Sequence, residues 1–308
     1  MKQYTSLYFV GAGGIGMSAL VRYFLAKGYK VAGYDRTQSP LTTELKAEGL
    51  EIVYEESVES IPDYCRNPET TLVVYTPAIP ASHVGLVYFR EHGFRVVKRA
   101  ELLGLITQSS KGLCFAGTHG KTTTSSMAAH IFHESPIGCN AFLGGILRNY
   151  NSNLILSEQS PFTVIEADEY DRSFHWLHPY MAVVTATDPD HLDIYGTEEA
   201  YLESFARFTS LIQPGGCLIM KKGIKLVPSV KENVKIYTYS ARDGGDFHAG
   251  NIRIGDGTIV FDFVMPEGSV ADIELGVPVE INIENAVAAM AIAWLNGVSG
   301  DDMRRAMA

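Results

Sequence analysis

The stretch LCFAGTHGKTTT, residues 113–124, is the part of this 308-residue chain that best predicts its fold. Its apolar residues lead into a loop bracketed by Gly117 and Gly120, and Lys121 opens a run of hydroxyl side chains. A strand, a glycine loop and a helix in this order form a phosphate cradle, because free N–H groups at a helix N-terminus point at an anion. The stretch therefore predicts a nucleoside triphosphate site.

The side chains of this loop suit a triphosphate and its metal ion. Lys121 supplies a point charge for the β- and γ-phosphates, and the Thr122 hydroxyl offers an oxygen to Mg²⁺. The generic P-loop pattern has its first glycine at the position of Phe115, so this loop is a shorter variant. The alternative interpretation is a simple strand-to-helix turn with a chance lysine.

Length and composition predict a soluble globular protein of two domains. The chain is 46% hydrophobic and 19% charged, and no apolar run approaches the roughly 18 residues of a membrane helix. No secretory signal is visible, and the four cysteines lie too far apart for a disulfide framework or a structural zinc site, so we expect a cytoplasmic protein. A net charge of −10 argues against a nucleic-acid partner but not against a small anionic ligand.

Two α/β regions follow one another along the chain. The first alternates short β-rich runs at 7–10, 31–34, 72–76 and 95–97 with helical stretches, which is the βαβ rhythm of a parallel sheet. The polar segment 107–112 interrupts this rhythm, and we predict domains at 1–108 and 109–308. The second region repeats the rhythm with strands at 113–116, 162–165, 181–185 and 217–220.

The later part of the second region has a different pattern. Turn signals without helices separate runs at 235–239, 251–254, 259–264 and 272–275, which predicts a small antiparallel sheet appended to the parallel one. A long apolar helix at 283–295 follows. The fold class is thus α/β, with a Rossmann-like parallel-sheet domain followed by a P-loop-type α/β domain that carries the appended sheet.

A second glycine loop, GAGGIG at 11–16, follows the first predicted strand. It matches G-x-G-x-x-G, and Asp35 ends the second strand nineteen positions after Gly16, as in a dinucleotide fingerprint. A nucleotide-sugar diphosphate fits this loop as well as NAD does, and a tight turn without ligand is the third reading. The segment 76–78 lies at the end of another strand, at the same edge of the sheet as the glycine loop. It either covers the ligand or is a loop stiffened by proline without a role in binding.

Acidic residues and a histidine follow two strands of the second region. Glu166 comes directly after the strand 162–165, and Asp168 and Glu169 follow it. Carboxylates so close together repel one another unless a cation lies between them. We therefore favour a role for Glu166 as a Mg²⁺ ligand over the alternative of a solvated acidic turn. For Asp168 and Glu169 the two interpretations are equally open. His191 reaches the same rim, where a metal or substrate role and a packed role are equally open.

Together these motifs resemble the Mur ligase family over essentially all 308 residues. GGIGMSAL at 13–20, AGTHGKTTT at 116–124, EADE at 166–169 and DPDHLD at 188–193 occur in the order and approximate spacing of the family. The sequences of these motifs are most similar to those of the alanine-adding members. The resemblance implies an ATP-dependent ligase of peptidoglycan precursor synthesis that joins L-alanine to the lactyl carboxylate of UDP-N-acetylmuramate through an acyl phosphate.

The resemblance also implies roles for particular residues. The UDP-sugar would bind in the first domain, without NAD, at Gly11, Gly13, Gly14, Ile15, Gly16, Asp35, Thr76, Pro77 and Ala78. ATP would bind in the second domain at Gly117, Thr118, His119, Gly120, Lys121, Thr122 and Thr123, with Asn282 and Asn285 near adenine. The implied catalytic residues are Lys121, Glu166 and His191, and the implied Mg²⁺ ligands are Thr122, Glu166 and His191.

The sequence departs from the family in three respects. Ile281 precedes Asn282 where many members have a histidine, and the segment 201–208 has no lysine of the kind that several sister ligases modify. The chain also ends about where the family's third, amino-acid-binding domain begins, so we expect little or no ligase activity from these residues alone. The rival functions are a murein-peptide ligase, an NAD(P)-dependent oxidoreductase and a non-catalytic nucleotide-binding module.

Overall fold

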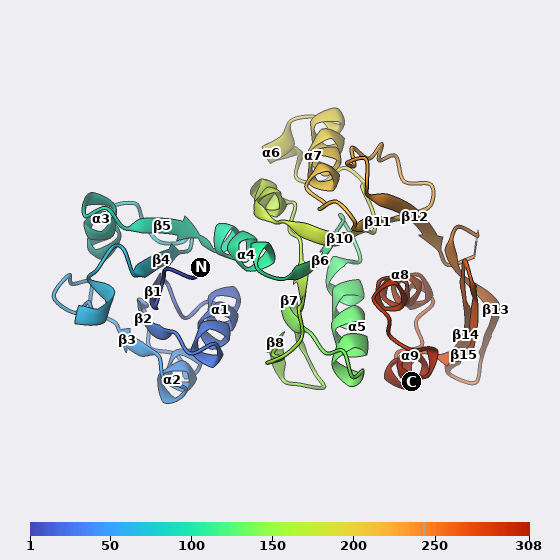
Figure 1. Cartoon of the computed structure of the whole chain (residues 1–308), viewed down its shortest axis with the longest axis horizontal. Helices are drawn as coiled ribbons and strands as arrows, with labels where there is room; N and C mark the ends of the chain where they lie inside the picture. The colour runs from blue at the N-terminus through green and yellow to red at the C-terminus, as the bar shows by residue number, and fades with distance from the viewer. Residues whose placement is uncertain (243) are drawn as a thin grey trace. The chain divides into compact units, whose positions relative to one another are not determined.

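The computed structural model describes residues 1–242 and 244–308, and the chain divides into two compact units, residues 1–106 and 107–308 (Figure 1). The predicted domain boundary lies two residues beyond this division. Within the described residues, no helix combines the length and apolar character needed to cross a membrane.

Unit 1 contains a five-stranded parallel sheet with the strand order β3-β2-β1-β4-β5. The central strand β1 is buried along its whole length, which is typical of a parallel sheet covered on both faces. The short strand β3 was not predicted, because only one of its three residues is buried. The strands are β1 (Ser6–Val10), β2 (Lys30–Tyr34), β3 (Glu51–Val53), β4 (Thr71–Tyr75) and β5 (Arg95–Lys98). The helices are α1 (Ile15–Ala26), α2 (Pro40–Ala47), η1 (Asp63–Cys65), α3 (Val84–Glu91) and α4 (Arg99–Gln108).

Unit 2 is built on a mixed ten-stranded sheet with the order β15-β14-β13-β12-β11-β10-β6-β9-β7-β8. Its first strands are β6 (Lys111–Ala116), β7 (Asn140–Leu147), β8 (Ser152–Ile155), β9 (Phe162–Glu166) and β10 (Pro179–Val184). They are followed by β11 (Cys217–Lys221), β12 (Lys235–Ser240), β13 (Phe247–Gly255), β14 (Thr258–Met265) and β15 (Gly268–Glu274). The helices are α5 (Lys121–Glu134), η2 (Tyr170–Trp176), α6 (Leu192–Tyr195), α7 (Glu198–Ser210), α8 (Ile281–Leu295) and α9 (Gly300–Met307).

The antiparallel part of this sheet corrects one detail of the sequence analysis. The run 235–239, predicted to belong to the appended antiparallel sheet, forms β12, which pairs in parallel with both β11 and β13. Only β13, β14 and β15 form the antiparallel extension, and they continue the parallel sheet. The hydrophobic pattern specifies strands but not their direction, which is set by the partner strand. The antiparallel hairpin partner β8 and the strand β7 were not predicted either.

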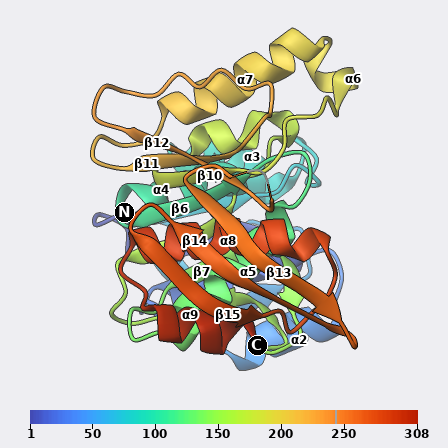
Figure 2. The same ribbon diagram turned by 90° about the vertical axis from the view of Figure 1, so that its right-hand side faces the viewer.

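The helix α8 lies at the centre of the core of unit 2. It packs against α5 and against the sheet, and Figure 2 shows β13, β14 and β15 extending across α8 and α9. All residues from Asn285 to Ala293 are buried, which explains why the predicted helix is apolar around its whole circumference. This burial holds the first turn of α8 beside the first turn of α5, where the glycine loop ends.

Candidate functional site

The loop between β6 and α5 requires its two glycines. Gly117 has φ +143° and Gly120 has φ +83°, a region that L-residues with side chains rarely adopt. A Cβ atom on Gly117 would also lie 2.1 Å from Thr185 Oγ1 and 2.8 Å from the backbone nitrogen of Ala186. The two glycines therefore allow the backbone to turn sharply between β6 and α5.

Residues after β10 hold this loop in place. The Thr185 hydroxyl donates to Ala116 O at 3.3 Å and also contacts His119 O. The Thr118 hydroxyl donates to Asp188 O at 2.7 Å and lies 2.9 Å from the Tyr201 hydroxyl. Sequence reasoning missed Thr185, although it is the last residue of the predicted strand 181–185, which was an available signal.

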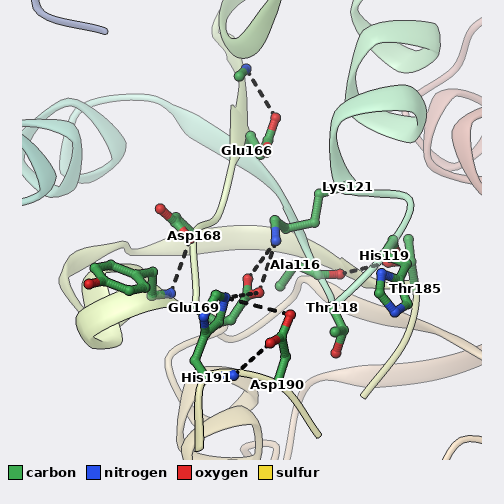
Figure 3. A network of polar contacts seen from close by, with 12 residues as sticks. Ala116, Thr118, His119, Lys121, Glu166, Asp168, Glu169, Thr185, Asp190 and His191 are labelled. Atoms are coloured by element: carbon green, nitrogen blue, oxygen red, sulfur yellow. Dashed lines mark hydrogen bonds and ion pairs between the residues drawn. The ribbon is translucent and has the colours of Figure 1, made fainter. Parts of the chain in front are cut away.

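Lys121 forms an ion pair with a buried carboxylate. Its Nζ atom lies 2.7 Å from Glu169 Oε2 and 3.0 Å from Glu169 Oε1 (Figure 3). The Glu169 side chain is only 1% exposed and that of Lys121 is 15% exposed, so the pair is largely shielded from solvent. Glu169, left undecided by the sequence analysis, is thus the direct partner of the loop lysine.

Glu166 lies close to the first turn of α5. Its Oε1 atom accepts a hydrogen bond from the Thr122 hydroxyl at 3.0 Å, and its Oε2 atom accepts one from the Gly144 N–H at 3.0 Å. A hydroxyl and a carboxylate side by side suit Mg²⁺, which prefers oxygen ligands and keeps several water molecules or phosphate oxygens. Within residues 1–242 and 244–308, no three acidic, histidine or cysteine side chains are arranged to hold a metal alone.

His191 does not join the Thr122–Glu166 pair. It has φ +52° and precedes α6, and its Nε2 atom lies 3.9 Å from Glu169 Oε1 and 3.8 Å from Asp190 Oδ2. The described contacts include no hydrogen bond or ion pair from His191 to Thr122 or Glu166. Its assignment as a metal ligand therefore stays a prediction.

Asn282 and Asn285 lie near the N-terminal end of α8 and are both buried. The Thr124 hydroxyl on α5 donates to Asn285 Oδ1 at 3.2 Å, and Asn285 Nδ2 donates to Asn282 Oδ1 at 3.3 Å. A Cβ atom on Gly120 would come within 3.1 Å of Asn285 Oδ1. The structure therefore brings these two predicted residues to the glycine loop, 161 positions away from Thr124 along the chain.

The glycine loop of unit 1 borders a pocket of about 610 Å³, within the size range of small-molecule sites. Gly13 N donates to Asp35 Oδ2 at 2.7 Å, so the predicted carboxylate contacts the loop directly. A Cβ atom on Gly11 would lie 2.5 Å from Thr76 Cγ2, which brings the Thr76 segment over the loop. The lining includes Gly11, Gly14, Asp35, Thr76 and Ala78 from the predicted set, with Met17, Tyr34, Arg36, Glu56, Ile79, Pro80 and His83.

His83 is a pocket residue that the sequence analysis missed. It is the N-cap of α3: its Nδ1 atom accepts a hydrogen bond from Leu86 N at 3.3 Å, so the neutral ring carries its proton on Nε2. The ring lies against Tyr34, with ring centroids 4.5 Å apart, and burial lowers the pKa of His83 below the ordinary 6.5. A histidine before a helix gives no distinctive signal in a single sequence.

Comparison with known proteins agrees with this geometry. Residues 6–111 match the profile described as "Mur ligase family, catalytic domain", and residues 115–293 match "Mur ligase middle domain". The chain belongs to the Mur ligase family. The UDP-N-acetylmuramate–L-alanine ligase of Parabacteroides distasonis is 66% identical over 308 residues, which is all of this chain and 67% of that protein. The corresponding ligase of Flavobacterium johnsoniae is 45% identical, again over all of this chain and 66% of the relative.

Solved Mur ligase structures share the fold. The UDP-N-acetylmuramate:L-alanyl-γ-D-glutamyl-meso-diaminopimelate ligase from Neisseria meningitides superposes with a TM-score of 0.82 at 21% identity and covers 99% of this chain and 97% of that one. The UDP-N-acetylmuramate–alanine ligase from Thermotoga maritima gives a TM-score of 0.78 at 23% identity and covers 98% of this chain and 67% of that one. The chain spans about two thirds of the length of the curated Mur ligases that it matches.

Proposed function

We propose that this chain carries the nucleotide-sugar and ATP sites of a ligase that joins L-alanine to the lactyl carboxylate of UDP-N-acetylmuramate. The observation that carries the proposal is the pairing of two different glycine loops in one chain. The loop before α5 has a lysine and a Thr122–Glu166 oxygen pair, whereas the loop before α1 has neither. The first suits a triphosphate with its cation, and the second suits a diphosphate.

The unit 1 pocket is assigned to the UDP-sugar. Gly14, the N-cap of α1, has no atom within 4 Å of the position where a Cβ would lie, so a diphosphate can approach the backbone there. Asp35 and Tyr34 at the end of β2 lie where ribose and base sit in related parallel-sheet folds. These features support binding of a nucleoside diphosphate and fit the UDP part of the nucleotide-sugar.

The chemistry activates a carboxylate. A free carboxylate resists amines because it is negatively charged and has no adequate leaving group. In the proposed reaction, a lactyl carboxylate oxygen attacks the γ-phosphorus of ATP, ADP leaves, and Lys121 neutralises the charge in transit. The amine of L-alanine then attacks the acyl carbon, its nitrogen releases a proton to solvent, and inorganic phosphate leaves with the electrons of the broken C–O bond. Positioning and electrostatics provide the rate without a protein nucleophile.

Mg²⁺ is assigned to Thr122 and Glu166, and His191 is retained as a candidate third ligand. When bound, the ion neutralises phosphate charge. The Glu166 carboxylate is oriented without the ion. It accepts hydrogen bonds from the Thr122 hydroxyl at 3.0 Å and from the Gly144 N–H at 3.0 Å. We assign the reaction to the cytoplasm, in keeping with four cysteines that are all buried free thiols.

The substrate that supplies the amine is assigned as L-alanine rather than a peptide. The relatives at 66% and 45% identity are named as alanine ligases, whereas the peptide-ligase structure from Neisseria is 21% identical and supports only the fold. The NAD(P)-dependent oxidoreductase is disfavoured because Lys121 and the Thr122–Glu166 pair would then have no role.

Calorimetric titration of two variants tests the proposal. Lys121→Ala should weaken ATP binding at least tenfold and leave UDP-N-acetylmuramate binding unchanged. Gly14→Asp should do the reverse, because it places a negative charge beside the diphosphate at a position with room for a side chain.

The crossed pattern is decisive because each variant loses one ligand and keeps the other, while circular dichroism confirms that both variants are folded. Affinity for NAD(P) with no response to UDP-N-acetylmuramate would replace the ligase proposal with the oxidoreductase. Loss of both ligands in one variant would mean that the two sites are not separate.

A further inference from the structure

We propose that Glu169 is a positioning residue that holds the Lys121 ammonium in place for the triphosphate. This inference rests on the proposed ATP site and adds a residue to it. Two strands contribute to the arrangement, because Lys121 follows β6 through the glycine loop and Glu169 follows β9. Figure 3 shows the two side chains directed toward each other below Glu166.

Burial makes the ion pair obligatory. The Glu169 side chain is 1% exposed, and a carboxylate removed from water is strongly unfavourable unless a cation and hydrogen bonds compensate it. Lys121 provides both, with Nζ at 2.7 and 3.0 Å from the two oxygens. His191 Nε2, at 3.9 Å from Oε1, is the second basic group facing this carboxylate.

The backbone of Glu169 is fixed independently of Lys121. Glu169 O accepts hydrogen bonds from the Tyr195 hydroxyl at 2.5 Å and from Arg172 N at 3.0 Å. Tyr195 is itself buried, and Ser204 Oγ donates to its hydroxyl at 3.4 Å. The backbone that carries the carboxylate is therefore held in place by groups other than the lysine.

The hydrogen-bonding capacity of lysine explains how one ammonium serves two partners. An ammonium has three N–H donors, and the two carboxylate oxygens use two of them. The third remains for a phosphate oxygen, and the ammonium stays in place while the nucleotide binds. Because a lysine side chain has four flexible bonds, fixing it beforehand removes an ordering cost from binding. Glu169 thus strengthens ATP binding through Lys121, although it is itself an anion.

A double-mutant cycle measured by ATP titration tests this inference. Glu169→Gln should weaken ATP binding about ten- to thirtyfold, a range set by the rotamer entropy of lysine. In the Lys121→Ala background, the same Glu169→Gln change should cause no further loss. A residue with only a structural role would weaken binding in both backgrounds.

Asp171→Asn is the matched control. It removes the same charge two residues further along, from an exposed side chain, and asparagine tolerates the φ of +50° found there. ATP affinity should be unchanged. Glu169→Asp keeps the charge but retracts the carboxylate, and should weaken ATP binding severalfold. It tests the inference even if Glu169→Gln does not fold, and circular dichroism reports the folding of every variant.

Three other outcomes would contradict the role of Glu169 or the ATP site itself. If Glu169→Gln tightens ATP binding, Glu169 competes with phosphate for Lys121 and the inference is wrong. Equal ATP affinity in wild type, Glu169→Gln and Glu169→Asp also overturns it, while the ATP site itself stands if Lys121→Ala weakens binding. Failure of the wild-type chain to bind ATP overturns both.

Discussion

At the scale of single residues, two adjacent glycines in β7 differ sharply in their surroundings. A Cβ atom on Gly144 would lie 2.3 Å from Glu166 Oε2, whereas one on Gly145 would make an ordinary contact at 3.5 Å with Thr122 Cγ2. Gly144 also donates its N–H to Glu166. The absence of a side chain at Gly144 therefore determines where the Glu166 carboxylate rests.

We predict that Gly144→Ala reduces the Mg²⁺-dependent part of ATP affinity severalfold or more, because the carboxylate must leave Thr122. Stability should change by less than about 1 kcal/mol, since the obstructed atom ends a flexible side chain and alanine suits a strand at least as well as glycine. Titration of ATP with and without Mg²⁺ measures the effect. Gly145→Ala, the matched control, should match wild type; equal effects of the two changes would contradict the assignment of Glu166.

At the scale of secondary-structure elements, one buried hydrogen bond joins the first turns of α5 and α8. Thr124 Oγ1 donates to Asn285 Oδ1, and both residues are buried. The two helices are in contact, and both contribute small side chains to the same buried core, such as Ala128, Ala129 and Ala289. The polar contact fixes the position of α8 beside the glycine loop.

We predict that Thr124→Val lowers the free energy of unfolding by about 1–3 kcal/mol, because valine preserves shape but removes the donor to Asn285. Urea denaturation followed by circular dichroism measures the loss. Thr123→Val changes the same chemical group at an exposed position one residue earlier and should cost less than about 0.5 kcal/mol. A loss of similar size in both variants would show that helix propensity, and not the buried bond, is responsible.

At the scale of the whole molecule, buried titratable groups limit the pH range of stability. Burial lowers the pKa values of His83, His130, His175 and His178 below 6.5. Burial raises the pKa of the Cys65, Cys139 and Cys217 thiols from 9.0 to about 12. In each case the folded protein favours the neutral form of the group.

We predict that stability is greatest between about pH 6.5 and 9. Below 6.5, the unfolded state binds more protons at histidine, so stability falls as the pH drops toward the lower folded pKa values. Above 9, the unfolded thiols lose protons first, so stability falls as the pH rises. Each group contributes at most about 1.4 kcal/mol per pH unit.

Calorimetry across this pH range measures the curve. His83→Asn, which can still cap α3, should make the acid slope shallower, and His92→Asn at the exposed C-terminal end of the same helix should not. An acid slope that is identical in wild type and His83→Asn would contradict the role of His83.

The sequence by itself determined the α/β class, the main strands around each glycine loop and the Mur ligase family, because these depend on local patterns of glycines and apolar residues. The positions of Lys121, Glu166 and Asp35 close to the two glycine loops were predictable for the same reason, since each lies directly after a predicted strand or loop. Only the tertiary structure decided the parallel direction of β12, the Lys121–Glu169 pair, the Gly144–Glu166 contact and the place of His83 in the pocket. These features depend on which distant segments lie beside one another, and burial, rather than residue type, gives Glu169 its obligatory partner.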